Sequence, residues 1–210
     1  MLKANIAVLV SGGGTNLQAL IDAEKSGIIN SGKIKLVISN KEGAYALERA
    51  EKAGIKTALV LKKELGSAEL FEDKLISLIE ENEIDIIVLA GLMAILSERF
   101  TGRYPEKIIN VHPSLIPSFC GKGFYGLHVH EAALAKGVKI SGATVHIVTP
   151  ECDAGPIVLQ KAVEVKEGDT PETLQRRIME EAEWKILPEA VRLFCDGKIY
   201  VEDNKAHIKN

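Results

Sequence analysis

The sequence predicts an α/β fold: an open, mostly parallel, twisted sheet with helices on both faces, Rossmann-like, and antiparallel strands in the C-terminal half. Two observations lead to this prediction. In the first half, short apolar runs alternate with segments whose apolar residues recur at helical spacing, which is typical of βαβ units with right-handed crossovers. In the second half, two strand-like runs are joined by a Gly/Pro loop without an intervening helix, which predicts an antiparallel pair.

The expected strands of the first half are short and apolar, as strands buried on both faces of a parallel sheet are. The first strand, 6–10, passes into the stretch SGGGTN and then into a helical pattern through Leu17, Leu20 and Ile21 that fades at Gly27. The elements that follow in chain order are strand 35–39, helix 45–53, strand 57–61, helix 69–81, strand 85–91 and strand 107–112.

The second half is expected to begin with the antiparallel strands 142–148 and 157–165. A long helix should follow, with Asp169 or Thr170 as its N-cap and Pro171 in its first turn. It should run to about residue 195, and Pro188 inside it should kink or break it. The tail is expected to form a small hairpin that turns at residues 203–204.

Composition limits the classes of protein to which the chain can belong. Its 210 residues are 46% hydrophobic and contain no linker-like segment, so we expect one domain, 1–210. The net charge of -3 argues against nucleic acid as a partner. We also expect no membrane span and no signal peptide. Three widely spaced cysteines argue against a disulfide framework and favour a reducing, cytoplasmic location.

The glycine-rich stretch after the first strand is a candidate anion site. Glycines let the backbone approach a ligand closely, and the N–H groups at the start of a helix favour negative charge. The Walker A pattern needs a lysine that is absent here, and the dinucleotide pattern needs a glycine where Thr15 or Leu17 stands. We therefore expect a phosphate of a small substrate on the amides of Gly14, Thr15 and Asn16; the alternative is a turn without a ligand.

The fragment INVHPSLIPSF, which closes the strand 107–112, is a candidate catalytic segment. Period-two geometry places Asn110 and His112 on the same face of that strand. An amide donor beside an imidazole can stabilise an oxyanion while a proton is relayed. A nearby carboxylate would favour the imidazolium. The best candidate is Asp153, in a loop with its own turn signal, and Glu151 is the competing carboxylate.

The remaining histidines are weaker candidates. His128 and His130 form an H-x-H pair that could begin a metal site, but no Cys/His/Asp cluster of the usual spacing accompanies them. We therefore expect no metal and a solvent-facing helix start at this pair. His146 alternates with its neighbours in a strand, where it is either a packed residue or a partner of the catalytic groups.

Together these motifs resemble those of the phosphoribosylglycinamide formyltransferases, the folate-dependent enzymes of purine synthesis. The resemblance covers nearly the full length and is carried by VLVSGGGTNLQALID, DIIVLAGLMAIL, INVHPSLIPSF, GATVHIVTPECDAGPIVLQ and EGDTPETL. It implies the formyltransferase fold and transfer of the formyl group of 10-formyltetrahydrofolate to the amine of glycinamide ribonucleotide. The implied reaction is direct attack through a tetrahedral intermediate, without a metal or a covalent enzyme intermediate.

The resemblance also implies roles for individual residues. Asn110, His112 and Asp153 match the catalytic trio, and Glu183 matches a carboxylate that contacts the ribonucleotide, although the helix spacing before it is one residue longer than expected. The turn Gly14, Thr15 and Asn16 matches the phosphate site. The segments that match the folate site contain Met93, Ala94, Ile95, Leu96, Thr149, Asp153 and, from the catalytic trio, Asn110.

Some positions depart from the family pattern. Ala94 and Ala68 stand where some members carry a basic residue, so we expect Lys62 or Lys63 to bind the glutamate tail of the folate, or that binding to be weaker. The stretch 120–134 is longer than in some relatives.

Three alternative functions are considered: an enzyme that formylates initiator methionyl-tRNA, a formyltetrahydrofolate hydrolase, and a non-catalytic phosphate-binding module. The oligomeric state, monomer or homodimer, is also left open.

Overall fold

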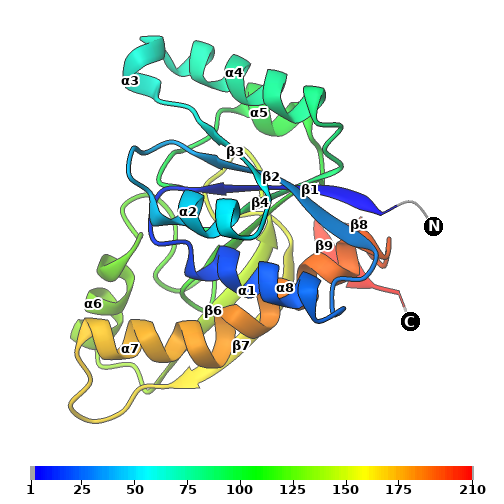
Figure 1. The fold of residues 1–210 in the computed structure, drawn as a ribbon. Helices are drawn as coiled ribbons and strands as arrows, with labels where there is room; N and C mark the ends of the chain where they lie inside the picture. Colours follow the sequence, from blue (N-terminus) through cyan, green and yellow to red (C-terminus); the bar gives the residue numbers. More distant parts are fainter. Residues whose placement is uncertain (1–2, 210) are drawn as a thin grey trace.

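The protein is described by a computed structural model that covers residues 3–209. Its main sheet has seven strands in the order β3-β2-β1-β4-β5-β6-β7, and Figure 1 shows helices on both sides of it. β1 through β5 pair in parallel, whereas β6 pairs antiparallel with both β5 and β7. The predicted α/β class, with its antiparallel C-terminal strands, is confirmed. The strands are β1 (Ala4–Val10), β2 (Gly32–Ser39), β3 (Lys56–Leu59), β4 (Ile86–Leu89), β5 (Ile108–His112), β6 (Ile140–Ile147) and β7 (Ile157–Glu164).

Alternating side chains of β1 divide the core between the two faces of the sheet. Ile6, Val8 and Val10 pack against one group of helices, whereas Ala7 and Leu9 pack on the opposite face. All five are fully buried, as expected for the central strand of a covered parallel sheet. The helices are α1 (Thr15–Lys25), α2 (Tyr45–Lys52), α3 (Lys62–Leu65), α4 (Ala68–Glu81), α5 (Glu98–Arg103), α6 (Leu127–Lys136), α7 (Pro171–Ile178) and α8 (Trp184–Cys195).

The strand order reverses between β1 and β4, and this reversal positions the site. In open α/β sheets, ligands bind in the crevice outside the carboxyl ends of the strands at such a switch point. The glycine turn follows β1, residues 90–96 follow β4, and Asn110 and His112 lie at the end of β5. Three of the predicted candidate segments are therefore brought to one edge of the sheet.

The C-terminal helix differs from its prediction in the place where it is interrupted. A π-helical turn, η1 (Met179–Glu183), separates α7 from α8, and Pro188 lies inside α8 rather than at a break. The proline is tolerated because its missing amide would have bonded the carbonyl of Trp184, at the junction where the winding already changes. The N-cap is Thr170, whose side chain accepts from the amide of Thr173 in a capping box.

The tail forms the predicted hairpin. β8 (Ile199–Glu202) pairs antiparallel with β9 (Lys205–Ile208), and the turn residues Asp203 and Asn204 both have positive φ. Across residues 3–209, no helix has the length and apolar character needed to cross a membrane.

Candidate active site

A cavity of about 660 Å³ lies at the carboxyl edge of β4 and β5. Four segments line it: residues 91–96 after β4, the end of β5, the loop 121–126 and the loop 148–153 with His146. Asn110, His112 and Asp153 all face this space, so the predicted trio converges in one place. The predicted pairing of Asn110 and His112 on one face of the strand agrees with this arrangement.

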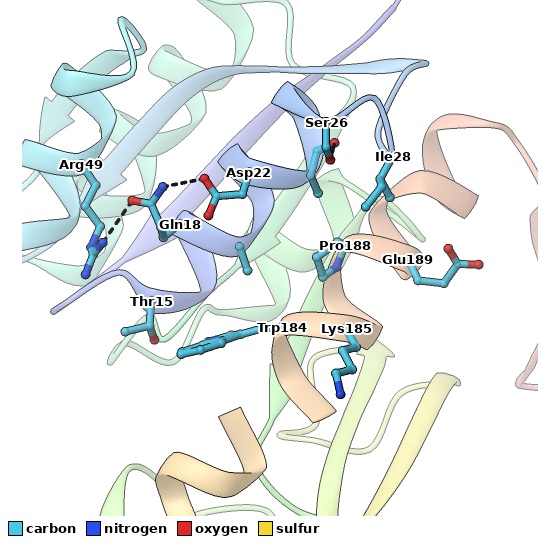
Figure 2. A pocket seen from close by; sticks show the side chains of 12 residues that line it. Thr15, Gln18, Asp22, Ser26, Ile28, Arg49, Trp184, Lys185, Pro188 and Glu189 are labelled. Atoms are coloured by element: carbon cyan, nitrogen blue, oxygen red, sulfur yellow. Dashed lines mark hydrogen bonds between the residues drawn. The ribbon is translucent and has the colours of Figure 1, made fainter. Parts of the chain in front are cut away.

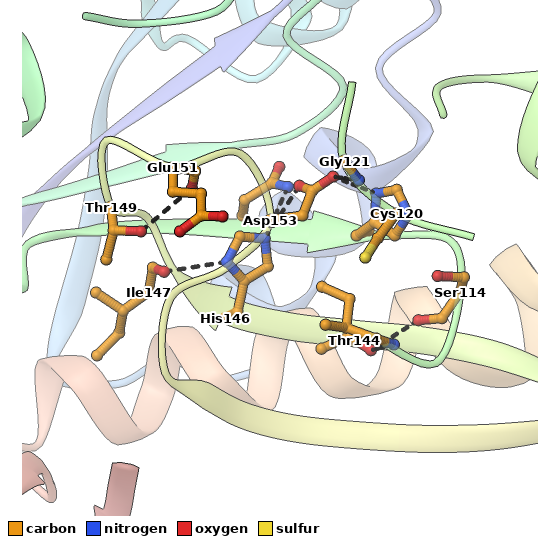
Figure 3. Close-up of polar contacts among 12 residues, drawn as sticks. Ser114, Cys120, Gly121, Thr144, His146, Ile147, Thr149, Glu151 and Asp153 are labelled. Carbon is orange, nitrogen blue, oxygen red and sulfur yellow. Dashed lines mark hydrogen bonds and ion pairs between the residues drawn. The ribbon is translucent and has the colours of Figure 1, made fainter. Parts of the chain in front are cut away.

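Asp153 lies at the centre of a network of polar contacts. Its Oδ2 accepts from the amide of Gly121 at 2.8 Å and lies 3.6 Å from Nδ1 of His112, while its Oδ1 lies 3.5 Å from Nε2 of His146. Figure 3 shows the carboxylate between His146 and Gly121. Burial opposes ionisation, but the nearby imidazole of His146, the hydrogen bond from the Gly121 amide and the imidazole of His112 outweigh it and lower the pKa of Asp153 to about 2. Asp153 is therefore a carboxylate at neutral pH.

Asp153, rather than Glu151, is the carboxylate that reaches the imidazole. It has a positive φ of 55°, a conformation that Asp tolerates better than most residues. Glu151 is exposed and does not line the cavity, and its carbonyl accepts from Thr149 at 3.2 Å. The loop conformation thus directs Asp153 into the cavity and leaves Glu151 exposed to solvent.

His112 differs from the prediction in its charge. Burial lowers the pKa of its imidazole, and this effect exceeds the opposing effects of the hydrogen bond to Phe119 and of the Asp153 carboxylate. In the free protein the ring is thus neutral at pH 7, whereas we expected an imidazolium. Nε2 donates to the carbonyl of Phe119 at 2.9 Å. Nδ1 is then the atom free to exchange a proton, because 3.6 Å to Asp153 is longer than a hydrogen bond.

The sequence left open whether His146 is a packed strand residue or a partner of the candidate catalytic residues, and the structure shows that it contacts Asn110. It lies opposite Asn110 in the β5–β6 pair, and its Nε2 is 3.2 Å from Nδ2 of Asn110. Its Nδ1 is 3.0 Å from the carbonyl of Ile147, so Nδ1 carries the hydrogen and Nε2 accepts from the amide in the neutral ring. This contact fixes the plane of the Asn110 amide and leaves its second N–H for a ligand.

The predicted folate residues form one wall of the same cavity. Met93 and Ile95 are large apolar residues with exposed fractions of 56% and 75%, and Ala94, Leu96 and Thr149 also line the space. The hydroxyl of Ser11 accepts from the amide of Met93 at 2.6 Å, so this wall is tied to the residue before the glycine turn. The sequence did not single out Ser11, because its partner is far along the chain and leaves no local signal.

The glycine turn has the backbone of an anion site. Gly14 adopts φ 70°, and α1 begins there without a side-chain cap, so the amides of its first turn are not bonded by a capping side chain. A Cβ at Gly14 would lie 2.6 Å from the Cβ of Ala46, which explains the glycine. A Cβ at Gly12 or Gly13 would meet nothing within 4 Å. These two glycines therefore leave open space beside the helix start.

Glu183 is joined to this turn. Asn16 donates from Nδ2 to its Oε2 at 2.7 Å, while the other amide atom, Oδ1, is buried and has no partner within the described part of the chain. Burial raises the pKa of Glu183 to about 7, against the opposing effect of the Asn16 bond. Glu183 is the last residue of the π turn, so its position depends on this local change of winding.

A second cavity, of about 710 Å³, lies between α1 and α8. Figure 2 shows Thr15 beside Trp184 there, and Arg49 bonded to Gln18, which is bonded to Asp22. Of the candidate residues, this cavity contains Thr15 alone. The predicted sites thus form two regions: the catalytic trio with the folate wall, and the glycine turn with Glu183.

The expectation for the H-x-H pair is wrong for His130. His128 is exposed and lies 3.0 Å from Glu131, but His130 is fully buried in α6, and burial lowers its pKa to about 4. His130 faces the core because Val129 and Ala133 lie on the same buried side of the helix. Within residues 3–209 there is no group of three or more His, Cys, Asp or Glu that could hold a metal ion. Cys120, Cys152 and Cys195 are free thiols.

Comparison with known proteins places this geometry in a family. The formyl transferase family model matches residues 4–191. The chain is 41% identical to the phosphoribosylglycinamide formyltransferase of Escherichia coli (strain K12), over 96% of this chain and 92% of that protein. It is 45% identical to the trifunctional purine biosynthetic protein adenosine-3 of Homo sapiens, but it spans 19% of that protein's length.

A solved structure agrees with these relatives. Glycinamide ribonucleotide transformylase 1 from Symbiobacterium toebii superposes with a TM-score of 0.93 at 41% identity, over 99% of this chain and 95% of that one. The chain therefore belongs to the phosphoribosylglycinamide formyltransferase family.

Proposed function

We propose that the protein transfers the formyl group of 10-formyltetrahydrofolate to the amine of glycinamide ribonucleotide, a step of purine biosynthesis. The observation that carries this proposal is the convergence of Asn110, His112 and Asp153 in one cavity with an apolar wall. An amide donor, an imidazole and an ionised acid suit acyl transfer, and family membership selects the formyl group among acyl groups.

In the proposed reaction the amine attacks the formyl carbon directly, and Asn110 and His112 act on the tetrahedral intermediate. The second N–H of Asn110 donates to the developing oxyanion, because the first is held by His146. His112 begins neutral, takes up a proton at Nδ1 from the attacking amine, and passes it to the departing folate nitrogen. Asp153 stabilises the transient imidazolium at 3.6 Å and organises the water that relays protons.

The substrates are assigned to the two regions by their chemistry. The phosphate of the ribonucleotide is assigned to the amides of Gly14, Thr15 and Asn16, and its ribose or amine end to Glu183. The flat pteridine and the formyl group are assigned to the cavity wall formed by Met93, Ala94, Ile95, Leu96 and Thr149. The single domain 1–210, the cytoplasmic location and the monomeric or homodimeric state stay predictions.

The proposal is tested by mixing the protein with 10-formyltetrahydrofolate and glycinamide ribonucleotide and following loss of the formyl donor. Loss that requires the ribonucleotide, with one formylated product per donor consumed, is expected. Loss without the ribonucleotide would instead indicate a hydrolase. A His112→Ala variant serves as the control, because it should retain the fold and lose the reaction.

A further inference from the structure

The cavity that holds the catalytic trio contains one full positive charge. Among its described lining residues, Lys122 is the only lysine or arginine, and Asp153 is the only aspartate or glutamate. The Asp153 carboxylate is already bonded to the amide of Gly121 and lies near two imidazoles. The ammonium of Lys122, by contrast, is in no ion pair among the residues that the structure describes. The ammonium of Lys122 is therefore the lining charge that remains available to pair with an anionic part of a ligand.

The backbone holds Lys122 beside the cavity. It is exposed and stands between Gly121 and Gly123, which adopt φ 86° and 97°. The amide of Gly121 is fixed to Oδ2 of Asp153 at 2.8 Å, so the residue next to Lys122 is anchored at the catalytic network. The backbone of Lys122 is therefore held near Asp153, while its exposed side chain is not fixed by an ion pair within residues 3–209.

The lysines that the sequence suggested for the glutamate tail, Lys62 and Lys63, do not supply a positive charge to this cavity. Lys63 pairs with Glu42 at 3.2 Å, and neither Lys62 nor Lys63 lines the cavity. Ala94 does line it but carries only a methyl group, and Ala68 begins α4 outside it. The expectation that Lys62 or Lys63 binds the glutamate tail of the folate is thus not supported by their positions.

We propose that Lys122 binds a carboxylate of the glutamate part of the formylfolate and so makes the enzyme prefer a glutamylated donor. The inference rests on the proposed function. The donor carries an aminobenzoyl ring followed by a glutamate with two carboxylates. Phe124 and Tyr125, on the same loop as Lys122, line the cavity together with the exposed Met93 and Ile95, and these apolar groups suit the ring.

The phosphate of the ribonucleotide is the competing anion, and the positions of the glycine turn argue against it. Gly14, Thr15 and Asn16 do not line the cavity that contains Lys122, and Thr15 lines the other cavity. A phosphate on the amides of this turn therefore lies outside the space that Lys122 borders.

The experiment measures KM for two formyl donors, 10-formyltetrahydrofolate and 10-formyltetrahydropteroate, which lacks the glutamate. Lys122→Ala should raise KM for the glutamylated donor about 3- to 10-fold, the effect of one partly exposed charge-assisted contact. The pteroate donor should be used equally by both forms, and Lys122→Arg should retain most of the preference. Lys63→Ala is the matched control and should change neither KM.

Other outcomes would overturn the assignment. An unchanged KM for both donors, or an equal rise for both, would remove any role in binding glutamate. A rise in KM for glycinamide ribonucleotide alone would assign Lys122 to the phosphate.

Equilibrium binding separates this inference from the proposed function. Tetrahydrofolate and tetrahydropteroate can be titrated into wild type and Lys122→Ala without the second substrate. A preference for the glutamylated ligand that Lys122→Ala abolishes supports the role of Lys122 even if no formyl transfer is seen. Equal affinity of wild type for the two ligands would overturn it.

Discussion

Two acids of the protein, Asp153 and Glu183, lie in environments that move their pKa values in opposite directions. Asp153 accepts from the amide of Gly121 and lies near the imidazoles of His112 and His146, and its pKa falls to about 2. Glu183 is buried with a single donor, the amide of Asn16, and its pKa rises to about 7. Burial dominates at Glu183, where one hydrogen bond opposes it, whereas at Asp153 the hydrogen bond from Gly121 and the two nearby imidazoles outweigh burial.

The contrast in pKa bears on the roles that we propose for the two regions. An acid that stays charged at every physiological pH can stabilise an imidazolium in the catalytic cavity but cannot itself deliver a proton there. An acid near neutrality can both accept and donate hydrogen bonds toward a ligand on the glycine turn. We therefore expect substitutions in the cavity that contains Asp153 to change turnover, and substitutions at the glycine turn and Glu183 to change binding of the ribonucleotide or stability.

Asn110→Ala and His112→Ala, both in the cavity that contains Asp153, should have the largest effects. Removal of one oxyanion donor costs about 100- to 1000-fold in kcat, and His112→Ala should lose as much or more. The measurement is steady-state turnover at saturating concentrations of both substrates, with thermal unfolding to verify the fold. A kcat within a few-fold of wild type for either variant would exclude the proposed oxyanion and proton-transfer roles.

Asp153→Asn tests whether the charge of this acid matters. Asn keeps the left-handed backbone, so the loop should persist, but kcat should fall by about 100-fold with a smaller change in substrate affinity. The carboxylate raises the pKa of His112, so its removal should lower that pKa further, and an NMR titration of the imidazole measures the shift. A loss confined to KM would instead make Asp153 a ligand contact.

Gly13→Val tests the other region by filling the space beside the helix start. A Cβ at this position meets nothing within 4 Å, so the variant should fold, while the Kd of glycinamide ribonucleotide should rise about tenfold or more because the cradle is blocked. Gly14→Ala is the comparison variant. Its Cβ would clash with Ala46, so it should lose stability as well as binding. Unchanged affinity in a folded Gly13→Val protein would refute the phosphate role.

The sequence was most informative where its signals are local. The alternation of apolar strands with helices predicted the sheet, and the positions of SGGGTN and Asn110-x-His112 at strand ends predicted the crevice. The turn signal around Asp153 and the family resemblance favoured this acid over Glu151, and the loop conformation that brings Asp153 to Gly121 agrees with that choice.

The properties that the sequence could not predict depend on contacts between distant segments. The neutral ring of His112 follows from burial, and the buried state of His130 follows from which side of α6 meets the core. The position of Lys122 beside the cavity depends on the bond between Gly121 and Asp153, which are far apart in the chain. The π turn that ends at Glu183 was also not predicted, because the residues around it have the spacing of an ordinary helix.

Glu183→Gln should have the smallest effect on turnover but a measurable effect on stability that depends on pH. In the folded protein the carboxyl keeps its proton up to about pH 7, whereas in the unfolded chain it loses it near 4.5. The contribution of Glu183 to stability is therefore complete below pH 4.5 and falls as the pH rises to 7. Gln keeps the bond from Asn16 and does not titrate, so the variant should be about 1–3 kcal/mol more stable than wild type at pH 8.

Urea unfolding at pH 4.5 and at pH 8 measures this difference, which should be near zero at the lower pH. An equal difference at both values would mean that the carboxyl is not protonated in the fold. The KM for glycinamide ribonucleotide completes the test, since Gln cannot offer a carboxylate to the ligand. If that KM rises and the variant is more stable at pH 8, the buried acid lowers stability and is needed for binding. If the variant is more stable but KM is unchanged, Glu183 is not part of the substrate site.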